Sequence, residues 1–119
     1  MRRLVAFTAL SCLLHCAPAQ AHHYVHQSYG DPRPHAWCGW YMRQIKGVAD
    51  RAYNLARNWA HWGRPGIAGI GAIVVWPHHV GEIVGRSASG EWIIRSGNDG
   101  HTVRERPRPI GGAIAIRWG

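Results

Sequence analysis

The stretch IGAIVVWPHHVGEIVGRSASGEWIIR, residues 70–95, decides the fold class of this chain. It contains three short segments that suit strands: the β-branched apolar run Ile70–Trp76, the alternating segment His79–Gly85, and Glu91–Arg95. Ser87–Gly90 has the small and polar residues of a turn between the last two. Short strands joined by such turns predict antiparallel neighbours in one sheet.

The residues before this stretch indicate two helices. Apolar side chains recur at helical spacing in Ala36–Lys46, and Gly47 ends that segment. Asp50 is a good N-cap for a second helix, which Gly63 and Pro65 stop. Both predicted helices therefore precede all the predicted strands.

The residues after the stretch add two more strands. Ser96–Gly100 is typical of a second turn, and Thr102–Arg106 and Ala113–Trp118 are predicted strands. Two helices followed by about five short strands predict an α+β fold, in which the N-terminal helices pack on a small antiparallel sheet.

The first 21 residues are typical of an export signal. Two arginines precede the apolar run Leu4–Leu14, which is too short to span a bilayer core of about 30 Å. Ala17, Ala19 and Ala21 then give the small-x-small spacing that a signal peptidase recognises. We expect cleavage near Ala21, a periplasmic or secreted protein, and no transmembrane segment after cleavage. A short N-terminal anchor is the alternative.

Residues 22–34 are polar, rich in His, Tyr, Gly and Pro, and lack a helical or strand period, which predicts a flexible arm. We expect no dedicated metal site at His22, His23 and His26, because no cysteine or carboxylate cluster accompanies them. Residues 35–119 then form the single domain that a chain of 119 residues allows.

The charge balance favours polyanionic partners. The chain has 14 Lys and Arg against 6 Asp and Glu, and cleavage would remove two arginines, which leaves a net charge of +6. For an exported protein we expect cell-wall polymers or other polyanions of the envelope as partners, and no nucleic acid. A basic surface that only aids solubility is the alternative.

Cys38 is the candidate nucleophile. Cys12 and Cys16 would leave with the signal, so Cys38 would be a lone thiol in an oxidising compartment. It lies at the start of the first predicted helix, where first-turn N–H groups lower a thiol pKa and donate to an oxyanion. The alternative is a small buried apolar residue, a common role of free cysteine.

A thiol nucleophile needs a base, and His79 at the start of a strand is the best candidate. His78 would point to the opposite face of that strand. Asn98, just past the next strand and followed by Asp99, is the candidate that orients the imidazole. Asn98 is equally suited to shaping its turn.

Four motifs in this order carry a family resemblance: WCGW at 37–40, GAIVVW at 71–76, HVGEIVG at 79–85 and SGN at 96–98. Together they resemble the CHAP and NlpC-like cysteine hydrolases, papain-like enzymes that cut amide bonds in peptidoglycan. The resemblance covers residues 34–118 and implies a papain-like core that needs no cofactor. It also implies that Cys38 is the nucleophile, His79 the general base and acid, and Asn98 the orienting residue. Many relatives carry an acidic residue where this chain has Ala72.

The expected function is therefore that of an exported, monomeric cysteine amidohydrolase or endopeptidase that acts on cell-wall peptide. The alternative is a non-catalytic module of the same fold, in which tryptophan and arginine side chains hold a glycan or a polyanion. Exposed tryptophans would favour that alternative. A third possibility is a metal site made by His61, His78, His79 and the arm, although no pair of these has ligand spacing on one helix face.

Overall fold

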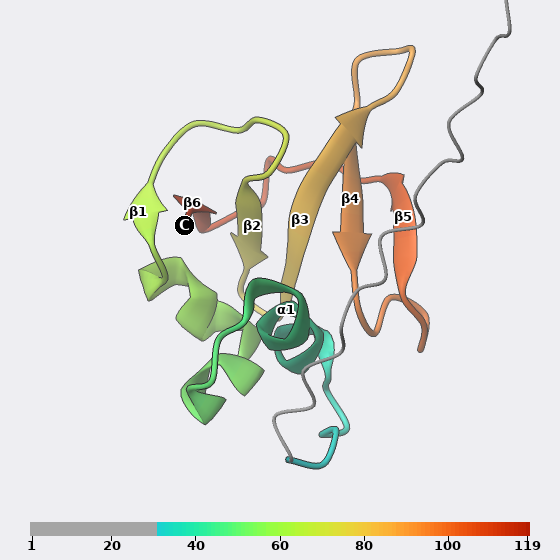
Figure 1. Ribbon diagram of the computed structural model, residues 1–119. Coiled ribbons are helices and arrows are strands. Elements are labelled where there is room, and N and C mark those ends of the chain that lie inside the picture. The colour runs from blue at the N-terminus through green and yellow to red at the C-terminus, as the bar shows by residue number, and fades with distance from the viewer. Residues whose placement is uncertain (1–30) are drawn as a thin grey trace, which may run out of the picture.

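The computed structural model of the chain describes residues 31–119 (Figure 1). The expected signal peptide, residues 1–21, and most of the expected arm, residues 22–34, lie outside the described residues. The described part is a small α+β domain with one antiparallel sheet, as predicted. None of the helices between residues 31 and 119 has the length and apolar character needed to cross a membrane.

The first helix, α1, spans Cys38–Lys46 and begins at the cysteine, as the sequence predicted. It ends at Gly47, whose φ of 67° is left-handed and lets its N–H donate to the carbonyl of Arg43. Cys38 and Met42 are buried on the side of α1 that faces the sheet. The apolar face of the helix therefore fixes the position of the cysteine against the strands.

The prediction of a second α-helix is wrong. Two 3-10 helices, η1 (Arg51–Asn54) and η2 (Ala56–His61), replace it, and Asp50 caps η1 by accepting from the Ala52 N–H at 2.9 Å. Two side chains donate hydrogen bonds to backbone carbonyls that would accept from the backbone in an α-helix. Asn58 donates to the Ala52 carbonyl, and the buried Trp59 indole donates to the Tyr53 carbonyl, each at 2.8 Å.

The sheet has six strands in the order β1-β6-β2-β3-β4-β5, and every pairing is antiparallel. The strands are β1 (Arg64–Pro65), β2 (Ile73–Trp76), β3 (His79–Arg86), β4 (Trp92–Ser96), β5 (Arg104–Pro107) and β6 (Ala115–Trp118). Five of them were predicted, with ends that agree or differ by up to three residues. The sequence did not predict β1, whose two residues pair with β6.

The two faces of the sheet bury different side chains. Val75 and Val80 point to the face that α1 and η2 cover, where they meet Cys38 and Trp59. The opposite face carries a second cluster, whose members include Ala72, Val74, Ile83 and Ile94. In Figure 1 α1 lies in front of the lower end of β3, the 3-10 helices lie below β1 and β2, and the chain from β5 to β6 passes behind the sheet.

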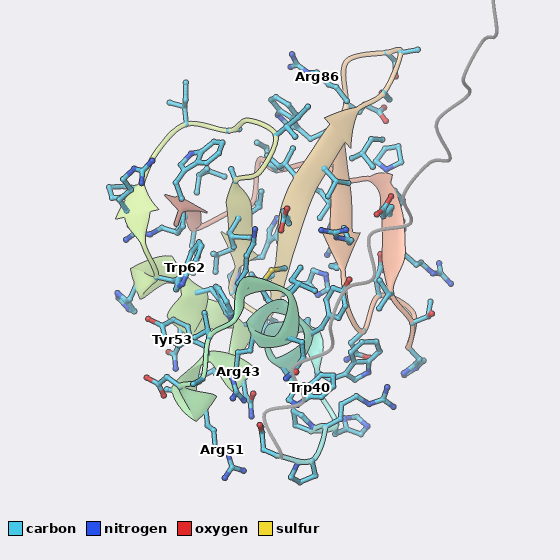
Figure 2. All side chains as sticks on the ribbon, viewed as in Figure 1. Trp40, Arg43, Arg51, Tyr53, Trp62 and Arg86 are labelled. Carbon is cyan, nitrogen blue, oxygen red and sulfur yellow. The ribbon has the colours of Figure 1, made fainter. Side chains whose placement is uncertain are left out.

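Arg43 ties α1 to the segments on either side of it. Its side chain is fully buried, and it donates to Asp31 at 2.8 Å, to Asn54 at 2.6 Å and to the carbonyls of Val48 and Ala49. Figure 2 shows Arg43 beneath α1, on the side of the chain that carries Arg51. The guanidinium thus joins the start of the described chain, the helix and η1.

We expect Arg43→Met to lower Tm by about 15 °C, because it leaves the Asp31 carboxylate buried without its strongest partner. Arg51→Met is the matched control. Arg51 lies 3.8 Å from the same carboxylate, but its side chain is 71% exposed, so the change should cost less than about 5 °C. Thermal unfolding followed by circular dichroism measures both, and equal shifts would contradict the role given to Arg43.

Candidate active site

The Cys38 thiol lies where several N–H groups converge. Its residue is only 4% exposed, and the N–H groups of Cys38, Gly39 and Val80 each donate toward the sulfur and lower its pKa. Burial acts in the opposite direction and is the larger effect, so the pKa of Cys38 is raised overall. The resting side chain is therefore a neutral thiol, held beside donors that suit a negative charge.

Gly39 permits this close packing. A Cβ at this position would meet the carbonyl groups of Tyr53 and Asn54, at 2.5 Å in the case of the Tyr53 oxygen. Both are backbone atoms of η1, so they cannot give way as a flexible side chain would. The glycine after the cysteine thus lets the first turn of α1 lie directly against η1.

The Val80 N–H reaches the sulfur because strand pairing stops short of it. The Ile83 N–H donates to β2 at Ala72, so alternation directs the N–H groups of Val80 and Glu82 toward β4. The β3–β4 pairing starts only at Glu82, opposite Arg95. The sulfur thus accepts the hydrogen bond from Val80 that a carbonyl of β4 would accept if the pairing continued.

His79 is the first residue of β3 and lies directly opposite Trp76, with 5.9 Å between the ring centroids. Its pKa is lowered from the ordinary 6.5 to about 4, chiefly by burial and also by the positive charge of Arg108, while Asp99 acts in the opposite direction. The imidazole is therefore neutral near pH 7, which is the form a general base requires. Trp76 packs with the second cluster, so the His79 ring lies on the side of the strand away from Val80. Cys38 packs with Val80 in the first cluster, so the imidazole and the thiol lie on opposite sides of the strand.

His78 does not open the strand, contrary to the sequence-based expectation. Pro77 and His78 form the tight turn between β2 and β3, and both are exposed. His78 lines an open groove of about 390 Å³ together with Cys38; the other lining residues are Pro34, Ala36, Asn54, Leu55, Ala56 and Pro77. The structure thus places His78 in the same groove as Cys38. His79 directly precedes Val80, whose N–H donates toward the sulfur. The choice between these two bases stays a prediction.

Asn98 has a φ of 53°, the left-handed geometry expected of a residue that shapes its turn. Its neighbour Asp99 is 7% exposed, and its charge acts on His79. Arg106 binds both oxygens of Asp99 at 2.6 Å and lowers the pKa of that carboxyl. Asp99 is thus an ionised group whose charge raises the pKa of the imidazole, and the orienting role of Asn98 stays a prediction.

Ser96 is a site residue that the sequence did not suggest. It is 1% exposed, and its Oγ lacks a hydrogen-bond partner among the described residues, as does the buried Nε2 of His79. A Cβ at Gly81 would lie 3.2 Å from the Ser96 Cβ, so both residues face the same side of the sheet as His79. The sequence offers one sign of this position: a hydroxyl residue that ends a mostly apolar strand, where it lies near the glycine two residues after the histidine.

Within residues 31–119 no three His, Cys, Asp or Glu side chains are grouped so that they could hold a metal ion. Comparisons of the chain with protein-family models, curated proteins and solved structures found no match. The geometry of the site and the sequence motifs are therefore the grounds for assigning a function.

Acidification should destabilise the fold through His79. The unfolded chain binds a proton at this residue near pH 6.5, whereas the folded chain binds it only near pH 4. Stability is therefore lost as the pH falls across this window, and we expect Tm to fall about 5 °C more in the wild type than in His79→Gln. Scanning calorimetry at pH 6.5 and 4.5 measures this difference. Parallel pH profiles of the two proteins would show that His79 is not buried as described.

Proposed function

We propose that this protein is an exported cysteine amidohydrolase or endopeptidase with a papain-like arrangement, and that its substrate is the peptide of cell-wall peptidoglycan. One observation carries the proposal. The thiol at the first residue of α1 accepts hydrogen bonds from N–H groups at the helix start and from the N–H of Val80, the residue directly after His79. Acyl transfer needs a nucleophile and donors for an oxyanion, which these groups provide, and a base, for which His79 at the start of β3 and His78 in the groove are the candidates.

The proposed reaction starts from a neutral pair. The Cys38 sulfur attacks the amide carbonyl carbon while a histidine takes the thiol proton, and the helix-start N–H groups receive the charge that develops on the carbonyl oxygen. The motif implies His79 as this base, which requires its ring to turn to the Cys38 side of β3; His78 already lines the groove beside Cys38. The imidazolium then gives its proton to the leaving amine, and the C–N bond breaks to leave a thioester. Water, deprotonated by the same imidazole, hydrolyses the thioester and restores the thiol.

The groove at Cys38 suits an extended peptide. Pro34 and Ala36 line it from the segment before α1, and Leu55 and Ala56 from the start of η2. Leu55 is 57% exposed, so it presents apolar surface that a substrate side chain would cover. Asn54 adds a polar side chain to the same groove.

The alternative, a non-catalytic glycan-binding module, has less support. All seven tryptophans lie within the described residues, and each is buried or half-buried. Trp59 is fully buried and Trp37 is 7% exposed, so these two contribute to the core. A glycan-binding face would need exposed aromatic rings.

Digestion of purified bacterial sacculi tests the proposal. We expect the purified protein to release soluble peptides, and mass spectrometry should show one new amine and one new carboxyl group for each cut. Sacculi whose stem peptides have been removed are the control, because they offer glycan without the amide bonds. Tight binding to both preparations without release of peptide would support the binding module and contradict the hydrolase.

A further inference from the structure

The loop between β1 and β2 exposes two large apolar side chains. Ile67 is 87% exposed and Ile70 is 63% exposed, the two highest values among the large apolar residues of the described chain. The other residues of this segment, 66–71, are glycine and alanine, and we call the segment the isoleucine loop. A single exposed isoleucine is common on a protein surface, but two in one loop of small residues form an apolar tip.

The isoleucine loop is held in place by Trp118, which packs beneath it. The Trp118 indole N–H donates to the Ile67 carbonyl at 3.0 Å, and a Cβ at Gly66 would lie 2.6 Å from the same nitrogen. The far end of the loop is fixed where the Gly71 N–H donates to the Ile83 carbonyl of β3 at 2.8 Å. The glycines thus admit the indole ring under the loop, and the space into which the isoleucines could fold is already filled.

The isoleucine loop lies at the end of the sheet away from the Cys38 groove. Strand β2 begins at Ile73, just after the loop, and ends at Trp76, next to the groove residues Pro77 and His78. In Figure 1 the loop and the turn between β3 and β4 lie at the top of the sheet, and the helices lie lower. A surface that contacts the loop would therefore leave the groove accessible.

Two arginines lie at the same end of the molecule. Arg64 is exposed in β1, directly before the loop, and Arg86 is exposed at the end of β3 (Figure 2). Neither forms an ion pair within the described chain, and the sequence between Asp50 and Glu82 has no acidic residue. Glu91, beside the β3–β4 turn, contributes one opposing charge. The net charge of +8 on the whole chain adds long-range attraction to an anionic surface.

We propose that the isoleucine loop docks on an anionic lipid bilayer. Ile67 and Ile70 enter the boundary between headgroups and acyl chains, and Arg64 and Arg86 contact the headgroup phosphates. The shape of the loop favours a bilayer over a protein partner. An isoleucine that is 87% exposed has hardly any neighbours, so a protein would have to supply the whole pocket, whereas a bilayer accepts any protruding apolar side chain. The inference does not depend on the proposed hydrolase function.

Co-sedimentation with lipid vesicles tests the proposal. The probes are vesicles of phosphatidylcholine with about 30% phosphatidylglycerol, and vesicles of phosphatidylcholine alone. We expect the protein to partition at least about tenfold more strongly onto the anionic vesicles, and high salt to weaken this binding. Ile67→Ser and Ile70→Ser should each lower the partition coefficient about tenfold, and Arg86→Gln about threefold.

Two matched controls come from the opposite end of the molecule. Leu55→Ser removes a 57% exposed apolar side chain from the groove, and Arg51→Gln removes an exposed cation that lies far from Arg86 in Figure 2. Each should change the partition coefficient less than about twofold. Because Ile67 and Ile70 are exposed, their serine variants should keep Tm within about 3 °C of the wild type, which excludes unfolding as the cause of lost binding.

Three results would overturn the proposal. The first is equal loss of vesicle binding in Leu55→Ser and Ile67→Ser. The second is undiminished binding by the double variant Ile67→Ser, Ile70→Ser, because charge alone would then hold the protein on the vesicles. The third is a dimer in sedimentation velocity that Ile67→Ser dissociates, without vesicle binding by the wild type, which would assign the loop to contact between two copies. Purified sacculi carry no bilayer, so Ile67→Ser should digest them as the wild type does, and failure of the hydrolase would be seen separately.

Discussion

Cys38→Ala should abolish release of peptide from sacculi, with a loss of at least about 1,000-fold in kcat/KM. The N–H groups of Gly39 and Val80 would remain in place, but no atom would be left to form the thioester. Cys38→Ser should lose nearly as much activity, because a serine hydroxyl holds its proton more tightly than a thiol. The assay is the sacculus digestion, with products counted by mass spectrometry.

Stability measurements separate this loss from unfolding. Cys38 is 4% exposed and packs against Met42 and Val80, so its truncation removes some buried contact, and we expect Tm to fall by less than about 10 °C. Met42→Ala is the matched control, since it removes more buried volume from the same cluster and leaves the thiol intact. A Cys38→Ala protein that still digests sacculi while Met42→Ala also does so would show that the cysteine is only a core residue.

The sheet could be predicted because its signals are local. Residues 70–95 combine β-branched runs with small polar turns, and these patterns give β2, β3 and β4. Strand β1 has no such signal. Arg64 and Pro65 form a strand only because Trp118 and Arg117, more than fifty residues later, provide its partner. Pairing over this distance is decided by the tertiary fold and leaves no trace in the two residues themselves.

The split of the second helix has a similar cause. Apolar spacing and the Asp50 cap predicted the position of the helical segment correctly. Its backbone conformation, however, depends on how the buried Trp59 side chain is hydrogen-bonded. Its indole N–H must find an acceptor once it is buried, and the Tyr53 carbonyl provides it at the expense of an α-helical hydrogen bond. Sequence spacing places a tryptophan on a helix face but does not reveal which carbonyl its N–H will take.

Only those features of the candidate site that depend on local sequence patterns could be predicted. The start of α1 at Cys38 and of β3 at His79 follows from local patterns. The opposed positions of the two histidines depend on a turn of only two residues, Pro77 and His78, which leaves His78 outside the strand. The ion pair of Asp99 with Arg106 joins a turn to β5, and nothing in the sequence around Asp99 indicates it.

His79→Ala should lower kcat about 100- to 1,000-fold, whereas His78→Ala should lower it less than about fivefold. The distinction requires the His79 ring to turn to the Cys38 side of β3 when substrate binds. His79 is held in β3 between Trp76 and the charges of Asp99 and Arg108, and its pKa of about 4 keeps it neutral over the working range. His78 is exposed in the turn and lines the groove, where a substrate would contact it.

The pH profile tests the same assignment independently. If His79 is the base, kcat/KM in the wild type should stay level as the pH falls through 6.5 and decline only toward 4, because that is where the imidazole gains its proton. His78→Ala should keep this profile, and a change in KM with little change in kcat would identify His78 as a substrate contact. A greater loss of kcat in His78→Ala than in His79→Ala would transfer the role of base to His78, and the groove-lining histidine would then be the partner of Cys38.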